Sequence, residues 1–410
     1  VNVLLTNGAR LYVDHAHPEY SSPEVTNALD ADLWDRAGEH VMLESVRALA
    51  HSPHTPEVNL YKNNVDGKGA SYGTHENYLV DRTVPFDELV SHLTPYLVTR
   101  PILVGAGRVG LGPSGEEAGF QISQRADYME AEVGLETTLR RPIINTRDEP
   151  HADPQRFRRL HVIIGDANCL EVATYLKVGM TSLILSVLEA GRTPLSWEGL
   201  RLADPVAAVS QVSRDLELTR PLELANGTWM TALEIQRVYL DGILQAQLDL
   251  DGAESAVLQR WERVLTLLET DRVAAAREVE WLAKLNVLEG LRGRHHLDWD
   301  HPKVAALDLQ WSDVRPERGI FARLRAAGAV VTLVTPEQVA AAASNPPEDT
   351  RAYFRGQALL RYPQAVVAAG WNGLVMDVAS QPSLVRIPMA DPTRGTKELV
   401  GSLFEAHREP

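Results

Sequence analysis

The sequence is poor in cysteine, because its 410 residues contain only Cys169. One cysteine excludes a disulfide within the chain and any zinc site built from several thiolates. The sequence also lacks an apolar run close to the roughly 20 residues that cross a bilayer. Its first residues lack the charged and apolar regions of an export signal. These absences predict a cytoplasmic protein that is neither inserted into a membrane nor exported.

Positive charge is also in short supply: 40 Lys and Arg stand against 55 Asp and Glu, which gives a net charge of −15. An acidic balance of this size argues against a general nucleic-acid binder. The hydrophobic fraction of 44% and the charged fraction of 23% are those of an ordinary globular protein. A chain of this length forms one large domain, or one large and one small domain, with an ample core.

Local patterns predict strands and turns in the first 165 residues and helices after them. The Asn7-Gly8 pair predicts a hairpin with a type I′ turn. Apolar residues at helical spacing predict one helix over residues 25–50. Further strand candidates are residues 58–63, 77–80, 97–104 and 160–164. The pair Asn168 and Glu171 predicts a capping box that opens a helix ending at Glu189.

The composition changes again after Val330, where short apolar segments and the turn at Pro346-Pro347 predict a small α/β module. The predicted fold class is therefore α+β: an antiparallel sheet flanked by many helices, with a small C-terminal domain. We place the domain boundary between residues 335 and 336, which gives domains 1–335 and 336–410.

The densest polar cluster contains Tyr12, Asp14, His15, His17 and Glu19. Side chains alternate along a strand, so Tyr12 and Asp14 share one face. A tyrosine, two carboxylates and two histidines within a few residues can form a site for a hard cation with a general base. The alternative is a polar strand end that only caps a sheet.

The second cluster is the segment 61–77, which contains three glycines and leads to His75 and Asn77. Such a loop can wrap an anion with its backbone N–H groups, although a plain surface loop is an equal alternative. The spacing of a Walker loop is absent. The segment 105–110 fits G-x-G-x-x-G, but the glycines and proline after it cannot continue into the helix of a dinucleotide-binding fold.

The third cluster runs from Arg140 to His161 and carries six arginines against three acidic residues, a local charge of +3. Guanidinium groups suit phosphates and carboxylates. Arg159 and His161 are two positions apart on one predicted strand, so their side chains can face the same site. A solvated charged surface is the alternative, and the contrast with the overall charge favours an anion site.

Three motifs in these clusters resemble the glutamine-synthetase-like enzymes of the Pup pathway. They are Tyr-Val-Asp…His-Pro-Glu-Tyr, Lys-Asn-Asn…Ser-Tyr-Gly-Thr-His-Glu-Asn-Tyr and Arg-Arg-Leu-His-Val. The family comprises a ligase that attaches the prokaryotic ubiquitin-like protein Pup to lysines and a deamidase/depupylase that prepares and removes it. The segments Asp14–Glu24 and Asp66–Ala70 resemble the depupylase more than the ligase.

The resemblance implies a concave antiparallel sheet that holds ATP and Mg²⁺, and it assigns roles to residues of all three clusters. The catalytic carboxylate is Asp14. The implied metal ligands are Tyr12, Glu19, His75 and His161. The implied nucleotide contacts are Arg147 and Arg159, at the γ-phosphate, with Ser71 and Asn77. We further expect Pup, an acidic and largely disordered chain in this family, to dock on Arg156 and Arg158.

The implied function is that of an ATP- and Mg²⁺-dependent hydrolase that deamidates the C-terminal Gln of Pup and cleaves the isopeptide bond between Pup and lysine. Its implied partners are Pup and pupylated proteins, with the proteasomal ATPase as a further candidate. The alternatives are a Pup–protein ligase, a catalytically dead Pup-binding scaffold and, with less support, a small-molecule γ-glutamyl ligase. The family also has a strand with a Glu-x-Glu motif, expected upstream of Val1, and its absence from this sequence motivates the scaffold alternative.

Overall fold

The computed structural model of the chain describes residues 2–14, 17–53, 55 and 57–405. The chain forms two compact units. Unit 1 combines residues 1–57, 149–157 and 334–410, and unit 2 combines residues 58–148 and 158–333. This division differs from the predicted domains, because residues 1–57 belong to the same unit as the C-terminal segment.

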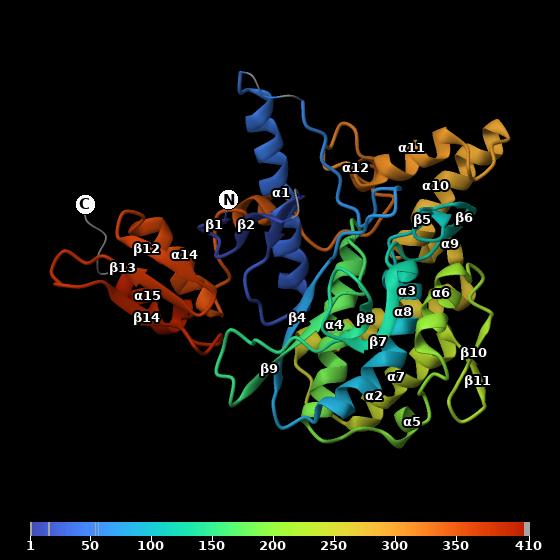
Figure 1. Cartoon of the computed structure of the whole chain (residues 1–410), viewed down its shortest axis with the longest axis horizontal. Helices are drawn as coiled ribbons and strands as arrows, with labels where there is room; N and C mark the ends of the chain where they lie inside the picture. Colours follow the sequence, from blue (N-terminus) through green and yellow to red (C-terminus); the bar gives the residue numbers. More distant parts are fainter. Residues whose placement is uncertain (1, 15–16, 54, 56, 406–410) are drawn as a thin grey trace. The chain divides into compact units, whose positions relative to one another are not determined.

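The described residues of unit 1 form two three-stranded sheets and four helices, which can be followed in Figure 1. The first sheet has the order β1-β2-β3 and the second the order β12-β13-β14. The elements are β1 (Asn2–Leu4), β2 (Arg10–Asp14), β3 (His17–Ser21), α1 (Ala28–Ala50), α13 (Pro336–Ala342), α14 (Arg351–Arg361), β12 (Val366–Gly370), β13 (Gly373–Met376), β14 (Val385–Pro388) and α15 (Lys397–Glu405).

The predicted hairpin is present, with β1 paired antiparallel to β2. Its turn is wider than type I′, since Gly8 has a φ of +81° and Asn7 does not have a positive φ. The reason is the buried Asn7 side chain, which donates to the Tyr20 hydroxyl at 2.9 Å and to the Ala342 carbonyl at 3.0 Å. Asn7 therefore anchors the hairpin to α13, and its Oδ1 also accepts from the Ala9 amide at 3.1 Å within the turn.

A buried charge cluster ties the two ends of the chain together inside unit 1. Arg355 donates to the Gly8 carbonyl at 2.8 Å and forms an ion pair with Glu24. Arg351 donates to the same carboxylate at 2.7 Å and to the Met389 carbonyl at 2.7 Å. Burial alone would raise the pKa of Glu24, but the two guanidinium groups lower it below its usual value.

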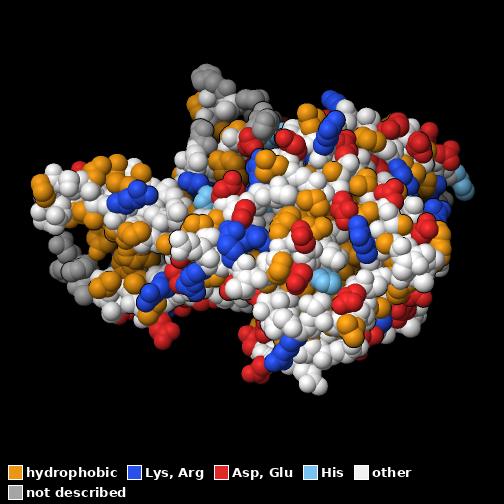
Figure 2. All heavy atoms as spheres, turned by 60° about the horizontal axis from the view of Figure 1, so that its bottom comes forward, with side chains coloured by type: hydrophobic (Ala, Val, Ile, Leu, Met, Phe, Trp, Pro, Cys, Tyr) orange, Lys and Arg blue, Asp and Glu red, His pale blue; other side chains and the backbone are white. Residues whose placement is uncertain are grey.

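Hydrophobic side chains are exposed on the part of unit 1 formed by β12–β14 and α15, at the left of Figure 2. Beneath them is a small core of Ala358, Leu374 and Met389. A second cluster of Trp34, Ala37 and Ala342 packs α1 against α13.

Unit 2 is built around a four-stranded sheet of order β4-β9-β8-β7. The pair β8 and β9 is antiparallel, whereas β7 and β8 are parallel, so this sheet is mixed and not wholly antiparallel as predicted. The strands of unit 2, with one short 3-10 helix (η1), are β4 (Glu76–Asp81), β5 (Arg108–Leu111), β6 (Glu117–Gln121), η1 (Ala126–Tyr128), β7 (Met129–Gly134), β8 (Arg141–Asn145), β9 (Phe157–Val162), β10 (Pro221–Glu223) and β11 (Trp229–Thr231).

Many of the buried side chains of unit 2 lie on its helices. They are α2 (Phe86–Thr99), α3 (Pro101–Val104), α4 (Glu171–Glu189), α5 (Leu195–Glu198), α6 (Pro205–Arg214), α7 (Ala232–Ala246), α8 (Gly252–Thr270), α9 (Arg272–Ala275), α10 (Glu280–His295), α11 (Pro302–Trp311) and α12 (Ile320–Ala326). Three tryptophans, Trp197, Trp261 and Trp281, are fully buried among them.

Helix α4 is the most buried long helix of unit 2, and its 19 residues are apolar enough to cross a membrane by length and composition alone. This run was missed in the sequence, where no such stretch was expected. Because 83% of its apolar window is buried inside the fold, α4 has the character of a core helix, which passes the same test.

Three local predictions in unit 2 are wrong. Residues 58–63, expected to form a strand, have only an isolated bridge between Tyr61 and Asp313. Residues 97–104, expected to form a strand, are the end of α2 and all of α3. The expected capping box is also absent, since no side chain caps the start of α4. Asn168 instead donates to the Val104 carbonyl at 2.8 Å, and Glu171 pairs with Arg325 at 2.9 Å.

Candidate active site

The site in unit 2 centres on two histidines, one on β9 and one directly before the neighbouring strand β4. His161 lies near the end of β9, and His75 directly precedes β4. Their rings meet edge to face, with centroids 4.9 Å apart and planes at 84°. A Cβ atom at position 73 would collide with the His75 ring, so the glycine there makes room for the pair. The structure therefore brings together two of the four predicted metal ligands.

The His161 ring is held in one orientation by Asn77. The distance from His161 Nδ1 to Asn77 Oδ1 is 2.8 Å, and Oδ1 also accepts a longer bond of 3.5 Å from Arg159. Because Oδ1 is an acceptor, Nδ1 carries the proton. His161 Nε2 is buried and has no hydrogen-bond partner among the described residues. Its lone pair is thus available to a ligand.

Burial lowers the pKa of His161 to about 3, with help from the neighbouring His75, Arg159 and Arg147. The imidazole is therefore neutral at physiological pH. A neutral ring with a fixed Nδ1–H donor is the form in which histidine binds a metal through Nε2.

A buried ion pair holds β4 in place behind the histidines. Glu76 accepts two bonds of 2.7 Å from Arg100, and both side chains are almost completely buried. Side chains alternate along a strand, so Glu76 points into the core while His75 and Asn77 point to the other side. A Cβ at position 165 would collide with Glu76, so Gly165 gives this carboxylate its space.

The glycine-rich loop is closed on itself rather than open to an anion at its tip. Val65 and Ser71 form an isolated bridge. Asp66 Oδ1 accepts from the backbone amides of Lys68 at 2.7 Å and Ala70 at 3.0 Å. The sequence suggested that the backbone amides of this loop could wrap an anion. These two amides are already bonded to Asp66 and are not available for that role. The Ser71 hydroxyl is the polar group of the predicted site that remains at the base of this loop.

The arginines of the third cluster have different surroundings. Arg147 is exposed, and its positive charge acts on His161, as does that of Arg159. Arg158 donates to the Val84 carbonyl at 3.2 Å and stacks over Phe86, so structural contacts occupy it.

Arg156 belongs to unit 1, stacks over Phe157 and keeps 63% of its side chain exposed. It is also 3.9 Å from Asp391. Of the two predicted Pup contacts, Arg156 is thus the one whose guanidinium is open to a partner.

The first polar cluster lies in unit 1 on the hairpin of β2 and β3. Tyr12 is paired with Glu19 and Asp14 with His17 across the two strands. Burial, together with Glu19, raises the pKa of Tyr12 to about 12, so its phenol stays protonated. Asp14 is exposed at the end of β2. His15 lies outside the described residues.

The described side chains match the predicted metal site only in part. The described part of the chain has no group of three or more His, Cys, Asp or Glu side chains that could hold a metal ion. The histidine pair offers two nitrogen donors, and Mg²⁺ prefers oxygen. Tyr12, Glu19 and Asp14 belong to the other unit, so their participation in one site with the histidines stays a prediction.

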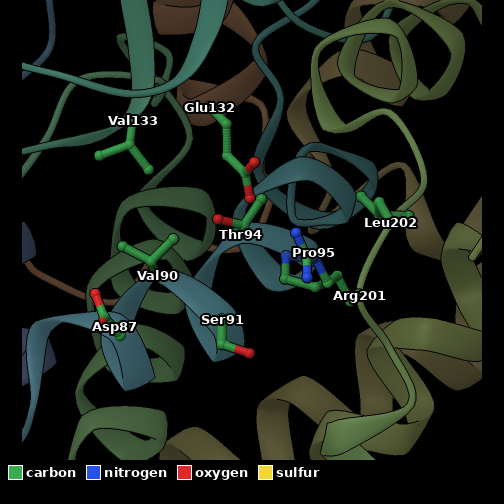
Figure 3. Close-up of a pocket in the computed structure, with 9 residues that line it drawn as sticks. All are labelled: Asp87, Val90, Ser91, Thr94, Pro95, Glu132, Val133, Arg201 and Leu202. Carbon is green, nitrogen blue, oxygen red and sulfur yellow. The ribbon is translucent and has the colours of Figure 1, made fainter. Parts of the chain in front are cut away.

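A hollow of about 240 Å³ lies elsewhere in unit 2 (Figure 3). Its nine lining residues, from α2, β7 and the segment before α6, include none of the predicted site residues. The Thr94 hydroxyl beside it is buried and lacks a hydrogen-bond partner within the described part of the chain.

Several buried polar residues that support the site were missed in the sequence. They are Asn64, Glu76, Arg100, Gln124 and Arg125. Asn64 donates to the Tyr72 carbonyl and accepts from the Ala167 amide, 103 residues away. Local spacing holds no signal for partners this distant. The sequence did hold a hint for Asn64 and Glu76, because both lie in the motif quoted from the segment 61–77.

Comparisons with known proteins give the site its context. The Pup-ligase protein family matches residues 1–375. The Pup deamidase/depupylase of Mycolicibacterium smegmatis is 54% identical over 407 residues, which are 99% of this chain and 81% of that protein. The solved structure of the Pup ligase PafA with ADP is similar, with a TM-score of 0.86 and 36% identity, over 99% of this chain and 90% of that one.

A second structure, the complex between Pup and its ligase PafA, matches with the same TM-score of 0.86 and 36% identity. It covers 99% of this chain and 83% of that one. The likeness to both structures confirms the predicted α+β, glutamine-synthetase-like fold class.

Proposed function

The chain belongs to the Pup-ligase protein family, and we propose that it is a nucleotide-dependent Pup deamidase and depupylase. One observation carries the choice between the two activities of the family. Identity to a Pup deamidase/depupylase is 54% over almost the whole chain, against 36% to the Pup ligase PafA. The substrates are Pup with a C-terminal Gln, and proteins that carry Pup on a lysine.

The reaction is hydrolysis of an amide at the γ-carboxyl group of Pup's last residue. Water adds to the γ-carbonyl carbon, the C–N bond breaks, and the nitrogen leaves with a proton as ammonia or as the lysine amine. Asp14 acts on the water or on this carbon. As a general base it removes a proton from the attacking water; as a nucleophile its carboxylate first displaces the amine to form an anhydride with the γ-carboxyl group, and water then hydrolyses this anhydride and frees Asp14. Both roles need a carboxylate in nearly the same place, so we leave them open.

The nucleotide is bound by residues of unit 2. Ser71 supplies a hydroxyl donor, and Arg147 and Arg159 supply guanidinium groups suited to the γ-phosphate. Asn77 takes part through its contacts with His161 and Arg159. Support for nucleotide binding comes from the relative solved with ADP. Because hydrolysis of an amide runs downhill in water, the bound nucleotide need not be consumed in each turnover.

We propose Mg²⁺ as the accompanying ion, with His161 Nε2 and His75 as its nitrogen ligands and Tyr12 and Glu19 as its oxygen ligands. When bound, the ion supplies a positive charge that polarises a phosphoryl or carbonyl oxygen. The buried His161 Nε2, which has no partner among the described residues, fits a metal ligand. The described residues do not bring three His, Cys, Asp or Glu side chains together, so they do not complete a metal site.

We propose Pup and pupylated proteins as partners, in line with the relative solved in complex with Pup. Arg156 offers an exposed guanidinium for an acidic partner. The proteasomal ATPase as a further partner and a cytoplasmic location remain proposals that rest on the sequence.

Mass spectrometry of Pup ending in Gln tests the reaction directly. Pup is incubated with this protein, ATP and Mg²⁺, and the terminal amide should become an acid, a gain of about 1 Da from exchange of NH₂ for OH. In a second sample, a pupylated protein should be cleaved into free Pup and a protein whose lysine side chain is unmodified. Omission of ATP is the control.

The ligase alternative predicts the opposite outcome. It would form the isopeptide bond with a lysine acceptor and release ADP in a one-to-one ratio with product. The dead scaffold predicts ATP or Pup binding without any change in the mass of Pup. Either outcome would contradict the proposed activity.

A further inference from the structure

Arg125 is a buried cation that the reaction proposed above does not use. It directly precedes η1 and is 1% exposed. Its guanidinium donates to the Ser71 hydroxyl at 2.6 Å and to the Tyr72 carbonyl at 3.1 Å. Through Nε and Nη2 it also donates to the Ile163 carbonyl at 3.2 and 3.0 Å. Arg125 thus joins the glycine-rich loop to the segment directly after β9.

The guanidinium of Arg125 bonds only to neutral acceptors. In the described residues, no carboxylate accepts a hydrogen bond from its side chain, and Asp166 instead accepts from its backbone amide at 3.1 Å. Burial, with repulsion from Arg141, lowers the pKa of Arg125 to about 10. A buried cation without an ion pair is costly. We expect a residue with this free-energy cost to have a role that offsets it, and ordering the glycine-rich loop for an anionic ligand is such a role.

The bond from Arg125 fixes how the Ser71 hydroxyl can interact. Since Nη1 donates to Oγ, the hydroxyl hydrogen remains to be donated elsewhere. Among the described residues, the Ser71 hydroxyl accepts this bond and donates none. A charged donor on Oγ polarises the O–H group and strengthens the bond that it donates. A phosphate oxygen is the kind of acceptor that such a donor fits.

The segment after Ser71 is fixed from other sides as well. Asn64 donates to the Tyr72 carbonyl at 3.0 Å and to the Thr74 hydroxyl at 3.1 Å. Arg141 reaches the Ser71 carbonyl with a longer bond of 3.4 Å. The loop base is therefore held up to the residue before His75, and the position of Ser71 relative to the histidine pair depends on these contacts.

We propose that Arg125 is a positioning residue for the nucleotide, holding Ser71 as a hydroxyl donor to a phosphate oxygen. Arg125 itself does not touch the nucleotide. It acts through Ser71, and it ties this serine to the segment that follows the strand of His161. The proposal rests on the nucleotide-dependent function proposed above and identifies what orders its binding loop.

Calorimetric titration of Mg²⁺ and ATP into four proteins tests the proposal: the unchanged protein, Arg125→Lys, Ser71→Ala and the double variant. Lysine keeps the charge but loses the fork that bonds three acceptors. Each single change should weaken ATP binding about tenfold, the effect of losing one hydrogen bond to a charged group. The double variant should bind only slightly more weakly than Ser71→Ala, because Arg125 acts through Ser71.

Enzyme kinetics gives a readout that a purely structural role would not produce. In Arg125→Lys, the ATP concentration for half-maximal deamidation should rise about tenfold, whereas the maximal rate should change much less. Arg108→Lys is the matched control, because Arg108 is also a buried arginine, and among the described residues its side chain bonds the Gly112 and Pro113 carbonyls and no others. It should leave ATP affinity unchanged. Ser71→Thr keeps the hydroxyl and should bind ATP more tightly than Ser71→Ala, a comparison that holds even where Arg125→Lys does not fold.

The outcomes separate this inference from the proposed function. An unchanged protein that does not bind ATP would contradict the function itself. If it binds ATP and Arg125→Lys binds equally well, the positioning role is wrong. The same follows if the effects of the two single changes multiply in the double variant, or if Ser71→Ala binds like Ser71→Thr.

Discussion

His161 has one ring nitrogen bound to Asn77 and another without a partner in the described residues. Removal of the ring in His161→Ala should therefore weaken the binding of Mg²⁺ with ATP more than it weakens the fold. Calorimetric titration at several Mg²⁺ concentrations checks this expectation. His295→Ala, an exposed histidine on α10, is the control. Unchanged affinity and unchanged Mg²⁺ dependence would leave His161 with a structural role only.

Asp14 is an exposed carboxylate on a strand whose neighbours Tyr12 and Glu19 pair across the hairpin. Asp14→Asn preserves the shape of the side chain and removes its charge and basicity. We expect deamidation and depupylation to be lost, with ATP affinity and thermal stability retained. Asp241→Asn, an exposed position on α7, should behave like the unchanged protein. Substantial activity in Asp14→Asn would exclude Asp14 as nucleophile or general base.

At the scale of elements, the ion pair of Glu76 and Arg100 anchors β4 against the helical core. Arg100→Met would leave a buried carboxylate without its partner, and such losses cost about 3–5 kcal/mol. Urea unfolding followed by circular dichroism measures this cost. The control is Arg47→Met on α1, which breaks an exposed pair with Glu44 and should cost about 0–0.5 kcal/mol. A similar small cost for Arg100→Met would contradict the anchoring role.

The same ion pair gives stability a pH dependence. Burial alone would raise the pKa of Glu76, but Arg100 lowers it below its usual value. A carboxyl group with a lowered folded-state pKa stabilises the fold above its unfolded pKa, and this contribution is lost as pH falls through the folded one. The unchanged protein should therefore lose stability on acidification more steeply than Glu76→Gln, in unfolding curves recorded from pH 7 downward. Parallel pH profiles would contradict this contribution.

Elements with a strong local signal were predictable from the sequence. The Asn7-Gly8 hairpin, α1, β4 and β9 were predicted within a few residues of their observed bounds. Residues 97–104 were not, because a fully buried apolar run fits a strand or a helix equally well. The histidine pair was predicted as one site from its motifs. Arg125 was not, since its partners Ser71 and Ile163 lie 54 and 38 residues away.

At the scale of the whole molecule, a net charge of −15 opposes association with an acidic partner. Docking of Pup then depends on local positive groups such as Arg156, which is exposed in unit 1. Arg156→Glu should weaken Pup binding several-fold in fluorescence anisotropy, with ATP affinity unchanged. Arg294→Glu, an exposed arginine on α10, adds the same charge elsewhere and is the control. Equal Pup affinity in both variants would exclude Arg156 from the docking surface.

Arg158 was predicted to bind Pup together with Arg156, but its substitution also removes structural contacts. Its bond to the Val84 carbonyl and its stacking on Phe86 would be lost together with its charge. A loss of Pup binding in Arg158→Glu is therefore informative only alongside an unfolding curve that matches the unchanged protein.

The cluster of Glu24, Arg351 and Arg355 has a consequence for biosynthesis. Residues 1–57 are synthesised first, yet their partners in unit 1 begin at Val334. At about 5–20 residues per second, tens of seconds of translation separate the two segments. During that time the Glu24 carboxylate and the Gly8 carbonyl have no guanidinium to bind. The nascent hairpin therefore lacks its partners until residues 334–410 have been translated. A ribosome that stalls before Val334 leaves a chain whose residues 1–57 are open to chaperones and proteases.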